Sequence, residues 1–452
     1  MNGYLLNAEI ALRSWRFVPY AYYRKGRKSA QGLYKDEFDF LMQCDGKTEL
    51  EPNDPLVKRF MENGFIAPAK QGAALTDWQK YLKCDNRYVP AMSWAITEKC
   101  SYDCLHCQNA DDNASEVSEW TLKEARTLIE QARRCGINAV TIAGGEPMLH
   151  PHFFEMIECI YANGMYVSDL HTSGCFINQA ALGRLCDIGC KPLIKICFDG
   201  SGNKNAQADM LRAVRLCVEH GFSVSVQANV HKLSAVCILA AAELLDQMGA
   251  DEMCLIRTFG PLRLKENAGD VCTDVEEYYE KMLRFTEGYR KKNHHMNIDI
   301  EEFLALFPQT KSYRMRPVEY AAGKYRGSVP ICRASRGIAA VAANGDLYPC
   351  MQLSGMCGAH SELIGNVKTD GLQALLQSGE YLNGICTAFG QLSGQKEKCA
   401  QCSYLKHCGG SCRVRVSSVS AKCVFFQKGW YKKIEKTLFD WENTAPMMEE
   451  GD

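Results

Sequence analysis

The sequence predicts an α/β fold: a partial (β/α)6 barrel of the TIM type, a small N-terminal α+β domain and a cysteine-rich C-terminal domain. Three observations predict it. Apolar runs of strand length alternate with amphipathic helical stretches from about residue 88 to residue 260. Polar or glycine-rich residues follow each of these runs, and cysteines gather at short spacings near the C-terminus. Repeated βα units with nearly continuous apolar strands imply a parallel sheet covered by helices.

The six candidate strands of the barrel are apolar runs of five to eight residues, at 91–97, 139–143, 166–172, 193–198, 223–230 and 253–258. The first helix between them begins with a capping box, in which Glu124 follows Thr121 by three residues. The first four strands are followed by EKCSYDCLHC, GGEP, TSG and DG. Barrel enzymes build their sites at the carboxyl ends of the strands, so the site is predicted there. Six units rather than eight predict a barrel that is open on one side and can admit a large substrate.

Changes in composition divide the chain into four parts. Residues 1–80 have their own apolar pattern, 88–310 form the barrel, 325–440 are rich in glycine and cysteine, and 441–452 are a tail. The 46% hydrophobic and 23% charged residues are typical of an ordinary globular protein, and a net charge of −1 argues against nucleic acid as a partner. There is no basic start with a sustained apolar core, and no apolar stretch approaches the ~18 residues of a membrane span. We therefore expect a cytoplasmic protein with no membrane partner.

The 24 cysteines are the unusual feature of the composition. In a reducing cytoplasm, clustered cysteines indicate metal or redox chemistry, whereas scattered ones act as small buried hydrophobic residues. Cys100, Cys104 and Cys107 form C-x3-C-x2-C after the first strand. A structural zinc site would need four ligands, and His106 lies between two of the cysteines, where its ring and the thiolates would struggle to face one ion. Three thiolates on a four-iron cluster would leave one iron open to an outside ligand.

This loop, followed by GGEP after the second strand, resembles the radical S-adenosylmethionine (SAM) superfamily. The resemblance implies a [4Fe–4S] cluster whose open iron binds the amino and carboxylate groups of SAM. It also implies which residues contact the cofactor: Gly144, Gly145, Glu146 and Pro147 at the amino group, and Thr172 and Ser173 at the ribose. The Arg-containing loop of many relatives is missing, which leaves Gln227, Asn229 and Arg257 as candidate partners of the SAM carboxylate.

A second set of cysteines lies in the C-terminal part: Cys332, Cys350, Cys399, Cys402, Cys408, Cys412 and Cys423. Taken alone, C-x2-C-x5-C-x3-C could equally be a zinc ribbon. With Gly345 before Cys350, the whole set resembles the SPASM domain, named for subtilosin, pyrroloquinoline quinone, anaerobic sulfatase and mycofactocin maturation. The resemblance implies two auxiliary [4Fe–4S] clusters. The outer one would use Cys399, Cys402, Cys408 and Cys423, and the inner one Cys332, Cys350 and Cys412. Cys357 or Cys386 could complete the inner cluster, or its last iron could be open to the substrate.

The N-terminal unit allows two interpretations. Apolar side chains at Phe38, Leu41 and Met42 can share one helical face, over which Leu56, Phe60 and Ile66 can close. The unit could be a helical cap packed on the barrel. It also resembles the small winged-helix peptide-binding domain of pyrroloquinoline quinone biosynthesis, which implies recognition of a leader peptide at a sheet edge.

The leading functional hypothesis is maturation of a ribosomally made peptide, in which a 5′-deoxyadenosyl radical starts formation of a thioether or a carbon–carbon crosslink. A flavodoxin- or ferredoxin-type protein would supply the electron. One alternative keeps the chemistry but oxidises a sulfatase or modifies a small molecule such as a tetrapyrrole. Another is a non-catalytic iron–sulfur carrier, against which the three-cysteine loop with GGEP argues. No residue has a motif that makes it the general base.

Overall fold

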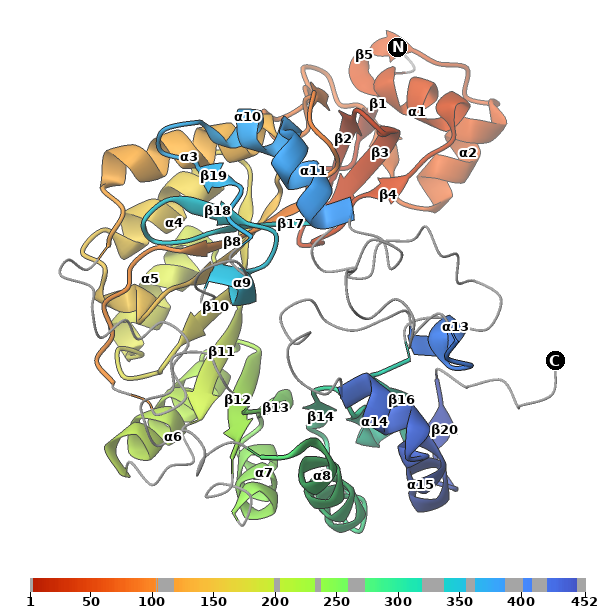
Figure 1. The fold of residues 1–452 in the computed structure, drawn as a ribbon. Coiled ribbons are helices and arrows are strands. Elements are labelled where there is room, and N and C mark those ends of the chain that lie inside the picture. The colour runs from red at the N-terminus through yellow and green to blue at the C-terminus, as the bar shows by residue number, and fades with distance from the viewer. Residues whose placement is uncertain are drawn as a thin grey trace.

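The computed structural model of the chain describes residues 3–102, 104, 118–198, 204–231, 237–258, 273–318, 337–354, 362–386, 401–408 and 421–444. A large sheet dominates the fold (Figure 1). Its centre consists of β8 (Ala91–Ala95), β9 (Ala139–Ala143), β10 (Tyr166–Thr172), β11 (Leu193–Phe198), β12 (Val224–Val230) and β13 (Glu252–Arg257). Each of these strands is parallel to the next. The six strands expected from the sequence are therefore present, in order, and the predicted α/β class is confirmed.

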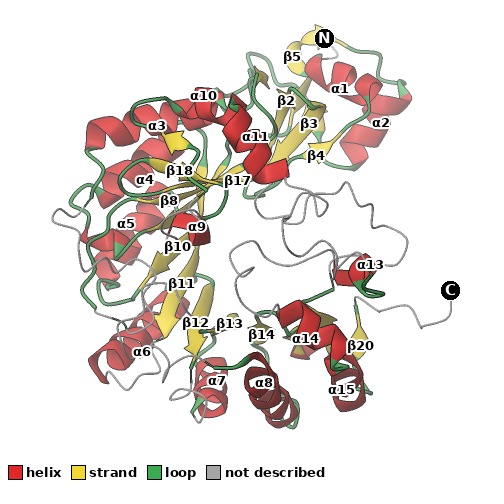
Figure 2. Ribbon diagram, viewed as in Figure 1, coloured by secondary structure: helices red, strands yellow, loops and turns green. Residues whose placement is uncertain are grey.

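Helices connect these strands and cover one face of the sheet (Figure 2). They are α3 (Leu122–Arg134), α4 (Phe153–Ala162), α5 (Gln179–Ile188), α6 (Lys204–Glu219), α7 (Ile238–Gln247) and α8 (Val275–Tyr289), with a short 3-10 turn η1 (Pro147–Leu149) before α4. The expected capping box starts α3, because Glu124 N donates to Thr121 Oγ1 at 3.2 Å and Thr121 N to Glu124 Oε2 at 2.9 Å. Among the helices in the described ranges, none is both long and apolar enough to cross a bilayer.

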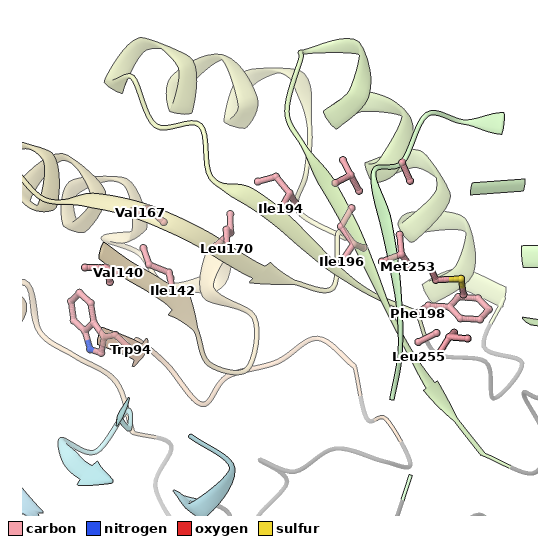
Figure 3. Close-up of a cluster of buried hydrophobic side chains, with 14 of the residues drawn as sticks. Trp94, Val140, Ile142, Val167, Leu170, Ile194, Ile196, Phe198, Met253 and Leu255 are labelled. Carbon is pink, nitrogen blue, oxygen red and sulfur yellow. The ribbon is translucent and has the colours of Figure 1, made fainter. Parts of the chain in front are cut away.

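The two faces of the parallel sheet differ in chemistry. Figure 3 shows Ile142, Leu170, Ile194 and Ile196, which are buried in the core between the sheet and the helices. Because successive side chains of a strand point to opposite faces, the residues between them belong to the other face. That face carries polar groups: Thr141, Asp169, His171, Lys195, Ser225 and Gln227. The barrel therefore has an apolar outer layer under the helices and a polar inner wall.

The sheet extends past the six predicted strands at both edges. Beyond β13 lie β14 (Asn297–Ile300), β15 (Leu304–Phe307), β16 (Ser312–Met315) and the two-residue β20 (Glu442–Asn443). Beyond β8 lie β17 (Ile338–Val341), β18 (Asp346–Tyr348) and β19 (Gly365–Asn366). The C-terminal part thus supplies the outermost strand at each edge of the sheet, β19 at one edge and β20 at the other. The stretch from residue 441, which was expected to be a tail, begins with strand β20. The remaining helices and turns are η3 (Pro308–Thr310), α9 (Met351–Ser354), α10 (Leu372–Gln377), α11 (Gly379–Cys386), α13 (Leu405–Cys408), α14 (Ala421–Gln427) and α15 (Trp430–Thr437).

The N-terminal unit is an α+β arrangement of two small sheets and two helices. One sheet has the order β5-β1-β6 and the other β4-β3-β2-β7. The bounds are β1 (Gly3–Leu6), β2 (Ile10–Trp15), β3 (Val18–Arg24), β4 (Gln31–Gly32), α1 (Lys35–Met42), β5 (Asp45–Glu49), α2 (Pro55–Glu62), β6 (Ile66–Pro68) and β7 (Leu82–Lys83). Phe38 and Leu41 are buried as expected, but Met42 is 39% exposed. Phe40 takes the core position instead, because its ring stacks on Phe60 at 5.7 Å between centroids.

This unit packs on the amino-terminal ends of the barrel strands. Trp15 Nε1 donates to Cys135 O at 3.0 Å, and Tyr23 OH donates to Gly136 O at 3.3 Å. Both acceptors precede β9, and both donor side chains are buried. The functional residues predicted at the carboxyl ends of the strands therefore lie at the opposite end of the barrel.

Candidate functional site

The glycines of GGEP hold the loop that carries the first cysteines. Gly145 N donates to Thr97 O at 2.8 Å, and Glu146 N donates to Lys99 O at 2.7 Å. A Cβ on Gly144 would lie 2.4 Å from Thr97 O, and one on Gly145 would lie 2.2 Å from Lys99 O. Neither contact is sterically possible, so only glycine lets the two backbones approach this closely. The segment that directly precedes Cys100 is thereby fixed against the end of β9.

Side chains of the same loop are fixed from the neighbouring βα units. Tyr102 OH donates to Asp209 Oδ2 in α6 at 2.5 Å. Burial and this hydrogen bond to a carboxylate both raise the pKa of Tyr102, so it stays protonated and remains a donor. Arg212, one turn further along α6, contacts Asp209 at 2.8 Å and donates to Cys175 O at 3.0 Å.

Cys175 joins the cysteine loop to the end of β10. Its Sγ lies 3.2 Å from Ser101 Oγ and 3.0 Å from Ser173 Oγ. Cys100 is exposed and Cys104 is partly buried, whereas Cys107 lies outside the described residues. Cys175 was not among the predicted site residues, although its position directly after the TSG segment indicated that it belongs to this end of the barrel.

The carboxylate of Glu146 ties GGEP to the residues after β10. Glu146 is fully buried and accepts from Ser173 N at 2.7 Å, Ser173 Oγ at 2.6 Å and Thr172 Oγ1 at 2.9 Å. It also accepts from Met148 N at 3.2 Å as it caps the turn that Pro147 opens. Two segments that the resemblance assigned separately, one to the amino group and one to the ribose of SAM, therefore form one connected unit.

Replacing Glu146 by Gln should loosen this unit without removing a thiolate. The amide would turn an N–H group toward donors that now face a carboxylate oxygen, and a lost hydrogen bond of this kind costs about 1–3 kcal/mol. We expect SAM to bind about tenfold more weakly by equilibrium dialysis, while the iron content stays that of the parent protein. Loss of iron together with SAM binding would instead show that Glu146 supports the cluster loop itself.

The three candidates for the SAM carboxylate do not converge. Gln227 and Asn229 lie on the inner wall of β12, opposite Cys254 and Ile256 of β13. The side chain of Arg257 alternates with those of Cys254 and Ile256 and therefore belongs to the other face of the sheet. It is 5% exposed, its Nη1 donates to Thr273 O at 3.4 Å, and its Nε lies 3.5 Å from Glu302 Oε2. The alternation of side chains along β13 therefore puts Arg257 on the opposite face of the sheet from Gln227 and Asn229. These two remain the candidates that share a face with the inner wall.

Charged groups on the inner wall form a network around one buried carboxylate, that of Asp169 in β10. Asp169 is 2% exposed, lies 3.3 Å from Lys195 Nζ and forms an ion pair with Lys28 of the N-terminal unit. Burial alone would raise the pKa of Asp169, but Lys195, Lys28 and Ser168 outweigh it and hold the pKa well below its usual value. Burial and the charge of Lys195 lower the pKa of His171 to about 4, so this imidazole is neutral at pH 7.

In the C-terminal part, the described cysteines and Gly345 lie on a small hairpin, on helices and next to them. Gly345, with φ of +96°, turns the chain between β17 and β18, and Asn366 donates to Asn344 O at 3.1 Å across that turn. Cys350 follows β18, Cys408 ends α13, and Cys423 lies in α14. Cys402 is also described, whereas Cys332, Cys357, Cys399 and Cys412 lie outside the described residues, and Cys386 is described only as the last residue of α11.

The residues present fit an iron–sulfur cluster at the carboxyl end of the barrel. Cys100 and Cys104 supply the soft thiolate donors that such clusters take, and the adjoining loop is held by backbone contacts that leave its thiols outside the core. Within the described ranges, no three Cys, His, Asp or Glu side chains already converge as a closed metal site.

Comparisons with known proteins match two parts of the chain to family models. The family model of the radical SAM superfamily matches residues 94–230, and that of the SPASM iron–sulfur cluster-binding domain matches residues 332–403. An AdoMet-dependent heme synthase of Methanosarcina barkeri is 22% identical over 72% of this chain and 91% of its own length. The mycofactocin maturase MftC of Mycobacterium ulcerans is 24% identical over 71% of this chain and 82% of its own length.

The fold also resembles solved structures over most of its length. The crystal structure of Streptococcus suis SuiB bound to its precursor peptide SuiA has a TM-score of 0.64, with 15% identity, and covers 93% of this chain and 98% of SuiB. SuiB bound to S-adenosylmethionine gives a TM-score of 0.62. At this level of identity, the similarity establishes a shared fold that includes the N-terminal unit and the C-terminal extension of the sheet.

Proposed function

The chain is a radical SAM enzyme with a SPASM domain, uses [4Fe–4S] clusters and SAM as cofactors, and from this premise we propose that it modifies a peptide. The observation that carries the proposal is the similarity to SuiB, which extends through the N-terminal unit and the added edge strands. The modification is a thioether or carbon–carbon crosslink, or a related oxidation. When bound, the cofactors supply the reducing electron and the radical that removes a hydrogen atom from the substrate.

The protein's own residues orient this chemistry. Gly144 and Gly145 let the cysteine loop approach β9, and Glu146 connects that loop to Thr172 and Ser173. We assign Cys100, Cys104 and Cys107 to the cluster that binds SAM. The auxiliary clusters are assigned to Cys332, Cys350 and Cys412 on the inner side and to Cys399, Cys402, Cys408 and Cys423 on the outer side. We propose that Gln227 and Asn229, on the inner wall, contact the SAM carboxylate or the substrate.

Residues 1–80 are the proposed recognition unit for the peptide. The two sheets of this unit, which extend to β7 just beyond residue 80, end in short strands, β5 and β6 in one and β4 and β7 in the other. An extended peptide can add to such an edge. The unit also docks firmly on the barrel through Trp15 and Tyr23. Binding energy from a remote part of the substrate can then hold the reacting residue near the cofactor. A flavodoxin- or ferredoxin-type reductant in the cytoplasm completes the proposed set of partners.

A tetrapyrrole is the second candidate substrate, and the similarity to a heme synthase favours it. That alignment leaves more than a quarter of this chain uncovered, whereas the similarity to SuiB covers 93% of it. We therefore favour a peptide. The two candidates differ in the products that they predict, since only a peptide substrate would change mass in a peptide assay.

Anaerobic incubation of the reconstituted, reduced enzyme with SAM should modify a peptide encoded by a short reading frame beside its gene. A crosslink formed by hydrogen loss lowers the peptide mass by about 2 Da, because two hydrogen atoms leave when one new bond forms. Mass spectrometry of the peptide measures this change, with enzyme lacking reductant as the control. Conversion of a tetrapyrrole carboxylate under the same conditions, with every neighbouring peptide unchanged, would contradict the proposal.

A further inference from the structure

The end of β3 and the loop that follows it carry four cations in five residues: Arg24, Lys25, Arg27 and Lys28, with Gly26 in the middle. A run of this kind is usually a solvated surface. Here it forms the wall of a pocket of about 620 Å³, lined by Arg24, Gly26, Arg27, Lys28, Ser29 and Gln31. A pocket of this size, lined by three cations, is suited to bind anionic groups.

The pocket lies at the amino-terminal end of the barrel strands. Asn138, which directly precedes β9, donates to Arg27 O at 3.3 Å, and Lys28 forms an ion pair with Asp169 on the inner wall. The cofactor segments follow the other ends of the same strands. Asp169 and Ser173 are four residues apart on β10 and its continuation, so they are about 13 Å apart along the strand. An extended peptide spans that distance with about four residues.

The positive charges of the pocket lining exceed the negative charges that pair with them. Asp169 is the carboxylate that faces Lys28, and it is shared with Lys195. Among the described residues, no carboxylate forms an ion pair with Arg24 or Arg27. The neutral His171 adds no charge at pH 7. The described lining of the pocket thus holds three cations and no carboxylate, and this excess of positive charge favours an anionic ligand.

We propose that this cationic pocket binds the carboxylates of an acidic stretch in the peptide substrate, about four to six residues from the residue that reacts. The inference rests on the proposed peptide substrate and names its chemistry. Arg24 and Arg27 hold the acidic side chains, and Lys28 with Asp169 fixes the loop on the barrel. Electrostatic attraction of this kind also speeds encounter and is weakened by salt.

Binding of fluorescein-labelled hexaglutamate to the full-length enzyme, measured by fluorescence anisotropy, tests the proposal. We expect the double variant Arg24→Gln/Arg27→Gln to bind the peptide about tenfold more weakly than the parent. The matched control is Lys25→Gln/Lys47→Gln, which also removes two positive charges from the N-terminal unit but none from the pocket lining. We expect this control to bind within about twofold of the parent, and labelled hexaglutamine not to bind.

An equal loss of hexaglutamate affinity in both double variants would contradict binding in the pocket, because net charge alone would then explain the result. Binding of coproporphyrin III, but not of hexaglutamate, with the same dependence on Arg24 and Arg27 would overturn the peptide as the occupant. Uncoupled SAM cleavage should be the same in all variants, because no substitution touches the cysteine loop or GGEP. The anisotropy assay needs no turnover, so its outcome is separate from whether any peptide is modified.

Discussion

A variant with Cys100, Cys104 and Cys107 all replaced by Ala should form no 5′-deoxyadenosine from SAM, whereas the reduced parent enzyme should form it readily. The thiolates hold the cluster whose open iron takes SAM, and the auxiliary clusters lack that role in the proposed assignment. Three four-iron clusters would give about twelve irons per chain in the parent, and the variant should keep about eight. Iron assay and chromatography of the anaerobic reaction measure both quantities.

The control for this variant replaces three cysteines far from the proposed clusters. Cys159 of α4, Cys186 of α5 and Cys217 of α6 lie singly near the C-terminal ends of their helices, which return to the amino ends of the strands. Their triple replacement by Ala should leave iron content and 5′-deoxyadenosine formation unchanged. If the first variant still cleaves SAM, the open iron lies elsewhere in the chain. Stoichiometric zinc in the C-terminal half would contradict the two auxiliary clusters.

Replacing Gly145 by Ala should almost abolish SAM cleavage although no metal ligand changes. The new Cβ would lie 2.2 Å from Lys99 O and 2.6 Å from Glu98 O, both backbone atoms, so the cysteine loop must move away from β9. A displacement of about 1 Å at a catalytic site can cost about a hundredfold in rate. We expect a loss of this size in 5′-deoxyadenosine formation, with iron lost from the barrel cluster and not from the auxiliary ones.

Gly183→Ala provides the matched control. Gly183 lies inside α5, and a Cβ there would have no neighbour within 4 Å. Alanine in place of glycine in a helix should stabilise the fold by about 0.5–1 kcal/mol. A small rise in Tm with unchanged SAM cleavage is therefore expected. Normal activity in Gly145→Ala would show that the close contact between GGEP and the cysteine loop is not needed for the reaction.

The periodic parts of the fold could be predicted because their signals are local. Each barrel strand is an apolar run bounded by polar residues, and Thr121 with Glu124 marks the start of α3. The pairing of β17 with β8 could not be predicted in this way. It joins residues about 250 positions apart, such as Ile338 and Ala91, and no local pattern of a four-residue strand specifies a distant partner.

In the candidate site, too, the features with a local signal could be predicted and those that depend on packing could not. Gly144, Glu146 and Ser173 were predicted at one end of the barrel because they follow predicted strands, and the structure brings their segments into contact. Arg257 was grouped with Gln227 because both lie near strand ends. The relative register of β12 and β13 decides which face each side chain takes, and sequence does not reveal that register. Likewise, the pocket at Arg24, Arg27 and Lys28 depends on how the chain turns between β3 and β4, and sequence does not reveal that conformation.

Transfer of deuterium from substrate to cofactor product tests the central claim most directly. The peptide from the neighbouring reading frame would be prepared from fully deuterated amino acids and incubated anaerobically with the reduced enzyme and unlabelled SAM. The proposed function predicts 5′-deoxyadenosine that carries one deuterium and a peptide that is correspondingly modified. Peptide modified to completion with 5′-deoxyadenosine free of deuterium would contradict removal of a carbon-bound peptide hydrogen by this enzyme.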